Sequence, residues 1–267
     1  MSRIAFVLIG FITFALSGCG LVLDPLVDRD PSSVALIQVS PEVRVFDPQD
    51  IRVTASQLQE RMEAMGTIGR ATTRGAGCIV ITAYGEGTAS ETFVNNLISM
   101  GLLEFVDVSI AGQDQVREQI GLPILTRVGR RRGVTVPDDA FSIGGRPFPT
   151  IITGDDVVSA QAQRDLQTLS WKVAVQFTPR AARILGNFTE GRLGRPMGIV
   201  LDGILLSAPI VQARIEDEAV ITGNYTATEA YVLAAQLNSG PLRLPLEIVQ
   251  LAETEAALDD RICFGTG

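Results

Sequence analysis

The chain has 267 residues, of which 46% are hydrophobic, carries a formal net charge of −8 at pH 7, and contains no histidine. This length fits one large domain or two small ones, and the acidic balance argues against nucleic acid as a partner. Because histidine is the commonest general base and metal ligand, its absence leads us to expect a non-enzymatic protein with no catalytic residue, metal or cofactor.

The amino end has the pattern of a bacterial lipoprotein signal. Arg3 supplies a positive charge, a short apolar run follows, and Leu16-Ser17-Gly18-Cys19 matches a lipobox. We expect residues 1–19 to be the signal peptide, Cys19 to be the lipid attachment site, and residues 20–33 to be a tether. A plain membrane anchor, or secretion after a nearby cleavage, is the alternative. The lipoprotein interpretation places the chain, lipid-anchored, on the extracytoplasmic face of the cell membrane, periplasmic or at the cell surface.

The sequence pattern of residues 34–110 predicts a first subdomain, which we call the base subdomain. A capping box at Thr54 predicts the start of one helix, and Ser90 that of another. Strands are expected between and around them, near residues 35–39, 43–46, 70–73, 78–83 and 102–108. The order strand–helix–strand–strand–helix–strand, in which residues 102–108 return to the sheet, is that of a ferredoxin-like fold.

Residues 111–150 are rich in glycine, proline and arginine and show little periodicity, so we expect a partly ordered connection. Residues 151–250 predict a smaller α+β head subdomain. Thr178-Pro179 and the Thr226 capping box each mark a helix start. Asp202-Gly203, set between two apolar runs, predicts a type I′ hairpin rather than a catalytic acid.

The fold class expected from these patterns is therefore α+β, with mostly antiparallel sheets in both subdomains. Residues 244–250 form the closing strand, which returns to the base, and residues 251–267 form a C-terminal tail. Two cysteines remain besides Cys19. Cys78 and Cys263 can pair in an oxidising compartment, or Cys78 can be a buried free thiol in its apolar run, and the sequence leaves both open.

Several short sequence motifs in the second half of the chain occur in a specific order: Gly198-Ile199-Val200-Leu201-Asp202-Gly203, Ser207-Ala208-Pro209, Ile221-Thr222-Gly223-Asn224-Tyr225 and Leu237-Asn238-Ser239-Gly240-Pro241. In this order they resemble the first periplasmic domain of SecD, a protein-export subunit, and residues 50–110 resemble its base more loosely. The resemblance implies a base-plus-head architecture in which Asp202, Gly203, Pro209, Gly223 and Gly240 are structural.

The resemblance also implies a polypeptide-binding role. SecD continues into membrane spans that use the proton gradient, whereas no apolar run of span length follows the signal in this sequence. We therefore expect a standalone lipoprotein that binds unfolded or emerging secreted polypeptide, or docks to the Sec translocon, without proton coupling. The alternative is a structural or interaction lipoprotein of the envelope that reuses the fold outside the export pathway. Phe188, Tyr225 and Tyr231 are candidate client-binding residues, although core packing is the interpretation that we favour for them.

Overall fold

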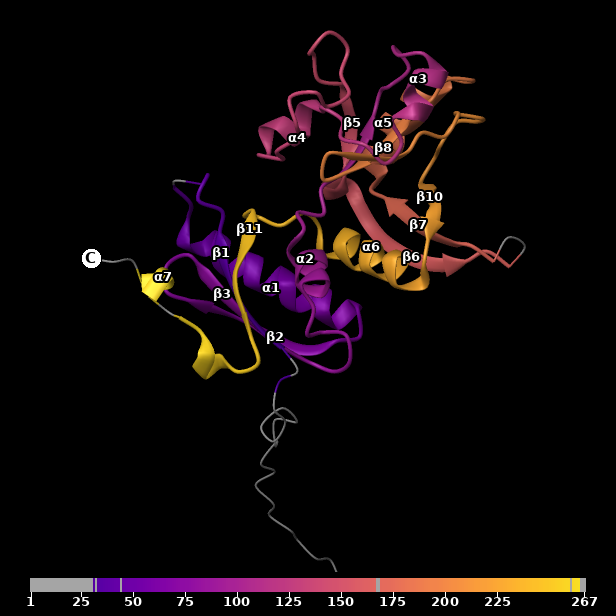
Figure 1. Ribbon diagram of the computed structural model, residues 1–267. Helices are drawn as coiled ribbons and strands as arrows, with labels where there is room; N and C mark the ends of the chain where they lie inside the picture. The colour runs from indigo at the N-terminus through magenta and orange to yellow at the C-terminus, as the bar shows by residue number, and fades with distance from the viewer. Residues whose placement is uncertain (1–30, 32, 44, 167–168, 260, 265–267) are drawn as a thin grey trace, which may run out of the picture.

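The computed structural model describes residues 31, 33–43, 45–166, 169–259 and 261–264. The expected signal peptide, Cys19 and most of the tether lie outside them. Figure 1 shows two bodies, which we call the base (residues 33–98 and 246–264) and the head (residues 103–239). The fold is α+β with antiparallel sheets, as predicted. In the described part of the chain, no helix has both the length and the apolar character needed to cross a membrane.

The base is one four-stranded sheet of order β11-β1-β3-β2, with two helices packed against it. Its elements are β1 (Ser33–Val39), α1 (Pro48–Ala64), β2 (Ile68–Arg74), β3 (Cys78–Tyr84), α2 (Glu91–Ile98) and β11 (Leu246–Ala252). The buried apolar residues of α1 and α2, among them Leu58, Met62 and Leu97, pack on the inward side chains of β1 and β3. This strand order is that of a ferredoxin-like sheet whose last strand comes from the far end of the chain.

Three predictions about the base are wrong. The residues predicted to return to this sheet, 102–108, form β4 (Leu103–Val106), which pairs instead with two strands of the head. Helix α1 begins at Pro48 rather than after Thr54, because Asp47 is its N-cap and proline suits the first helical turn. The hydroxyl of Thr54 donates instead to the Asp50 carbonyl, inside the helix. Residues 43, 45 and 46 are not in a strand.

The head contains two sheets. One has the order β10-β7-β6 and consists of β6 (Val157–Arg164), β7 (Trp171–Phe177) and β10 (Glu218–Tyr225). The other has the order β5-β4-β8-β9 and consists of β4, β5 (Thr150–Thr153), β8 (Gly198–Leu201) and β9 (Ile204–Ser207). Helices α5 (Pro179–Glu190) and α6 (Ala227–Ser239) share one buried core with both sheets. A single 3-10 turn, η1 (Gly154–Asp156), separates β5 from β6.

Residues 111–150 are folded more extensively than a connection requires. They contain α3 (Gln113–Glu118) and α4 (Arg127–Arg131) and carry their own buried cluster, in which the rings of Phe141 and Phe148 lie 5.0 Å apart. This cluster packs on Val200 and Leu205 of the β8–β9 hairpin. The segment therefore belongs to the packed structure of the head, although its periodicity is weak.

The local signals of the head are confirmed. Thr178 accepts a hydrogen bond from the Ala181 amide, and Thr226 forms a complete capping box with Glu229. Asp202 and Gly203 both have positive φ, 49° and 79°, as a type I′ turn requires, and they join β8 to β9. After β11 the described residues contain η2 (Glu255–Ala257) and α7 (Arg261–Phe264).

Candidate binding cleft between base and head

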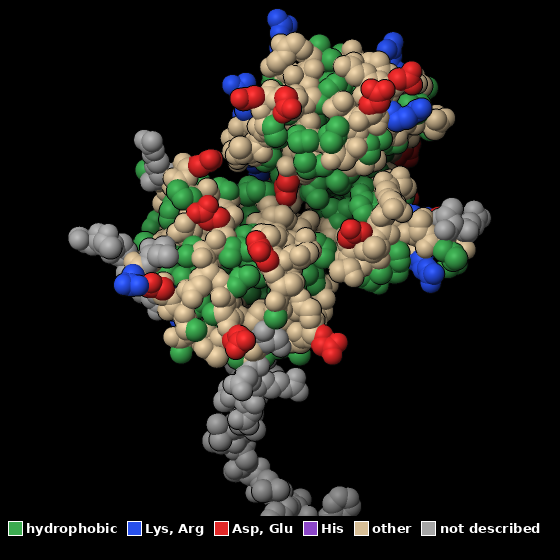
Figure 2. All heavy atoms as spheres, viewed as in Figure 1, with side chains coloured by type: hydrophobic (Ala, Val, Ile, Leu, Met, Phe, Trp, Pro, Cys, Tyr) green, Lys and Arg blue, Asp and Glu red, His purple; other side chains and the backbone are tan. Residues whose placement is uncertain are grey.

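A cleft of about 280 Å³ lies where the base meets the head. In Figure 2, hydrophobic side chains lie on both sides of the waist between the two bodies. The cleft is lined by residues from the end of α2, from the β8–β9 hairpin, from the end of β10 and from one side of α6: Asn96, Ser99, Leu201, Asp202, Leu206, Tyr225, Thr228, Glu229, Val232, Leu233 and Gln236. Four segments, from three separate parts of the sequence, thus form one concave surface.

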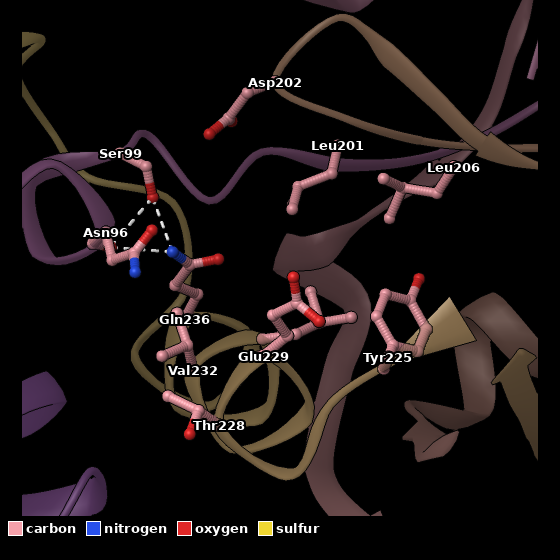
Figure 3. A pocket seen from close by; sticks show the side chains of 11 residues that line it. Asn96, Ser99, Leu201, Asp202, Leu206, Tyr225, Thr228, Glu229, Val232 and Gln236 are labelled. Carbon is pink, nitrogen blue, oxygen red and sulfur yellow. Dashed lines mark hydrogen bonds between the residues drawn. The ribbon is translucent and has the colours of Figure 1, made fainter. Parts of the chain in front are cut away.

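One end of the cleft is polar and closely tied together. The Nε2 amide of Gln236, on α6, donates to the Asn96 carbonyl at 2.8 Å and to the Ser99 Oγ at 2.6 Å (Figure 3). Gln236 is buried although it is an amide, since these bonds satisfy it. This side chain therefore connects the last helix of the head to the second helix of the base.

The other end is formed by Tyr225 and Leu206, which Figure 3 shows beside each other. Burial raises the pKa of the Tyr225 hydroxyl, and the nearby Glu229 carboxylate raises it further, so this group stays neutral at physiological pH. Hydrogen bonds from the backbone and hydroxyl of Thr226 lower the pKa of Glu229, which keeps that carboxylate ionised. The cleft thus combines an apolar wall with a fixed negative charge at its rim.

Asp202 lies at the tip of the β8–β9 hairpin. It contacts the segment between α2 and β4, in which the chain passes from base to head. Its carboxylate accepts hydrogen bonds from the backbone amides of Gly101, at 3.0 Å, and Leu102, at 2.7 Å. Burial raises the pKa of this carboxyl, and the two amides and the charge of Arg61 oppose the rise. The residue therefore has a structural role beyond its turn, which the hairpin pattern alone did not predict.

Arg61 of α1, which is fully buried, is the other charged residue at this crossing. Its guanidinium donates to Ser239 Oγ and to the carbonyl oxygens of Leu97, Ser99, Met100 and Gly240, at distances between 2.5 and 3.1 Å. Burial lowers its pKa to about 10, against the opposing effect of Asp202, so it is charged at pH 7. It therefore holds together both segments that connect base and head. Sequence reasoning missed Arg61, although its position beside Leu58 and Met62 on the apolar stripe of α1 was a usable signal.

The three candidate client-binding residues do not form one patch. Tyr225 lines the cleft. Tyr231 is 51% exposed on α6, and its ring lies 5.5 Å from that of Trp171. Phe188 is half-buried against the head core, with the Arg192 guanidinium over its ring. Of the three, Tyr225 has the position that a ligand in the cleft would contact, and a client-binding role for any of them stays a prediction.

The remaining site residues occupy structural positions. Cys78 of β3 and Cys263 of α7 are joined as a disulfide, with Cα atoms 5.5 Å apart. Gly240 ends α6 with a φ of 70°, and a Cβ on Gly223 would lie 2.8 Å from the Tyr225 ring. The carbonyl of Pro209 accepts from the Met197 amide at 3.0 Å. Within the described ranges, no group of three or more acidic, cysteine or histidine side chains could hold a metal ion.

These features define a class: a two-body α+β domain whose head is inserted into a ferredoxin-like base. Residues 146–244 match the family described as SecDF, P1 head subdomain. A protein translocase subunit SecD from Syntrophobacter fumaroxidans is 36% identical over 102 residues, which cover 38% of this chain and 19% of that protein. Residues 146–244 are thus similar to the P1 head of SecDF, and the predicted resemblance is confirmed.

Two solved SecDF structures show the same fold over a longer stretch. A SecDF crystal structure in a super-membrane-facing form has a TM-score of 0.64 and 22% identity, covering 82% of this chain and 30% of that one. A second structure, of a SecDF described as a membrane component that enhances protein export, has a TM-score of 0.59 and 22% identity and covers 81% of this chain. That second match spans 98% of the solved chain, so base and head together correspond to it.

Proposed function

We propose that this chain is a non-enzymatic, lipid-anchored extracytoplasmic protein that binds exported polypeptide in the cleft between base and head, in contact with the Sec translocon. The cleft carries the proposal, because it combines an apolar wall with a fixed charge and is formed jointly by the two bodies. The SecD-type head supports a place in protein export, since the curated relatives are translocase subunits. Lipid attachment at Cys19 is supported by the lipobox.

Site-specific photo-crosslinking in living cells tests the binding role. A photoreactive phenylalanine analogue at Tyr225 would report from inside the cleft, and the same analogue at Ile68, exposed on β2 of the base, is the matched control. We expect adducts with nascent secretory chains from position 225 and not from position 68. Equal labelling from the two positions would overturn the cleft as the binding site. Adducts restricted to a folded envelope protein would favour the alternative role outside export.

Two further measurements separate the parts of the proposal. Leu206→Glu places a charge on the apolar wall of the cleft and should weaken binding of a carboxymethylated, unfolded secretory precursor about tenfold. Leu251→Glu, an equal change at an exposed position on β11, should leave that binding unchanged. Labelling with radioactive palmitate, lost in Cys19→Ala, tests the lipid anchor independently.

A further inference from the structure

Strand β10 forms one edge of its sheet in the head, and its outer side is unpaired. The Phe177 amide donates to the Asp217 carbonyl directly opposite, at 2.9 Å. In an antiparallel ladder, hydrogen-bonded and non-hydrogen-bonded pairs alternate. From this register, the backbone groups of Glu218, Val220 and Thr222 point away from β7.

Two other sheet edges are each blocked at one point by a side-chain amide. Asn238 accepts from the Ala160 amide at 2.8 Å and donates to the Ala160 carbonyl at 2.9 Å, so it replaces a neighbouring strand along β6. Gln59 does the same along β2, where it donates to the Gly69 carbonyl and accepts from the Ala71 amide. Blocking open edges is a common way for proteins to avoid unwanted strand pairing.

The β10 edge has no such block among the described residues. Nothing in that part of the chain bonds to the outward backbone groups of Val220 or Thr222, and the Val220 side chain is 44% exposed. Figure 1 shows β10 along the outer side of the head. Since side-chain amides block the edges of β2 and β6 at one point each, a β10 edge without such a block points to a use for it.

Two hollows lie at the opposite ends of β10. At the Glu218 end is a hollow of about 370 Å³ whose apolar lining includes Met197, Val211 and Ile215. At the Tyr225 end is the cleft between base and head. The strand has eight residues, about 26 Å at 3.3 Å per residue, and is regular from Glu218 to Thr222, with a register shift before Tyr225. One extended segment along it spans the distance between the two hollows.

The charges along this path are acidic. Glu216, Asp217 and Glu218 are exposed at one end, and Glu229 is exposed at the other. The nearest cation of the same loop, Arg214, is already paired with Glu190 at 2.6 Å. An occupant with basic side chains therefore complements the surface, while apolar side chains suit the two hollows.

We propose that the open edge of β10 binds an extended segment of unfolded polypeptide as an additional strand, with apolar side chains in the two hollows and basic side chains facing the acidic ends. Backbone pairing gives affinity without requiring one sequence, which suits a protein that meets many clients. This inference rests on the proposed function and deepens it by naming how the polypeptide is held.

Backbone-modified probes test the pairing directly. The probe is a synthetic peptide of about twelve residues in which valine and lysine alternate. Two modified forms are compared: one is N-methylated on the valine amides only, and the other on the lysine amides only. An added strand presents every second amide to β10, so one modified form should bind about tenfold more weakly than the other. Equal affinities for the two modified forms would overturn strand addition while leaving polypeptide binding intact. Failure of every form to bind would overturn both proposals.

The protein side supplies a second measurement. On binding the unmodified peptide, the amide protons of Val220 and Thr222 should become protected from hydrogen exchange, whereas that of Ile221 is already bonded to β7. Val220→Pro removes an outward amide and should weaken binding about tenfold, while Val220→Thr keeps the amide and should bind as the parent does. Unchanged exchange at positions 220 and 222 in the bound state would overturn the proposal even if the proline variant failed to fold.

Discussion

The Nε of Arg61 donates a hydrogen bond of 2.9 Å to the Oγ of Ser239, a residue 178 positions further along the chain. Arg61 belongs to the base, whereas Ser239 is the last residue of the last head helix. The same guanidinium also bonds the carbonyls that follow α2, where the chain first leaves the base. One buried side chain therefore joins both crossings between the two bodies.

Arg61→Lys should destabilise the protein by about 2–4 kcal/mol. An ammonium keeps the charge but cannot reach acceptors on two sides, so several buried carbonyls lose their donor. Urea unfolding, followed by far-UV circular dichroism, measures the loss. Arg52→Lys, on the exposed side of the same helix, is the control and should change the unfolding free energy by less than about 0.5 kcal/mol. Equal effects of the two changes would contradict the role assigned to Arg61.

Asp202→Ala should cost about 2 kcal/mol, because it leaves the amides of Gly101 and Leu102 without their acceptor and places alanine at a φ of 49°. Asp202→Asn tolerates that φ and keeps one acceptor oxygen, so it should cost less. Thermal unfolding of the two variants compares them. If asparagine and alanine proved equally destabilising, the carboxylate charge rather than its geometry would be the essential property.

Local signals carried most of what the sequence predicted correctly. The cap at Thr178, the capping box of Thr226 and Glu229, and the Asp202-Gly203 turn depend on neighbours within four residues, and all three are present. The start of α1 was missed because Thr54 and Gln57 imitate a capping box, whereas the true signal was Asp47 followed by proline. The Thr54–Gln57 pattern lies inside the helix, where it does not act as a cap.

Long-range pairing could not be predicted in the same way. The apolar run at β4 fits a strand in either body, and only its partners β5 and β8 decide that it belongs to the head. The cleft depends on the same kind of contact, since it brings Ser99, Leu206 and Gln236 together from separate segments. Tyr225 was named from its residue type, and its position in the cleft follows from how β10 packs.

The Cys78–Cys263 pairing closes a loop of 185 residues and should contribute about 5 kcal/mol in the entropic account. Cys263→Ser should lower the unfolding free energy by that amount, and a reducing agent should produce the same loss in the parent protein. Mass spectrometry under non-reducing conditions counts the free thiols. Two free thiols at positions 78 and 263 in protein isolated from the cell envelope would contradict the pairing.

Glu104 gives a prediction for pH dependence. This β4 carboxylate is fully buried and accepts hydrogen bonds of 2.6 Å from the hydroxyls of Thr126 and Thr150. Burial raises the pKa of Glu104 above its ordinary value of 4.5, and the two hydroxyls only partly oppose the rise. The folded state thus binds this proton more tightly than the unfolded state does. The stability that this proton contributes is complete below pH 4.5 and is lost as the pH rises through the raised pKa of Glu104.

Glu104→Gln removes this titration. The unfolding free energy of the variant, relative to the parent, should therefore increase between pH 4 and pH 7, by about 1.4 kcal/mol for each unit by which the pKa is raised. Urea unfolding at a series of pH values measures the difference. Glu118→Gln, an exposed change of the same charge on α3, corrects for the altered net charge. A difference that stayed constant, or fell, as the pH rose would show that the hydroxyls of Thr126 and Thr150 stabilise the carboxylate more than its burial destabilises it.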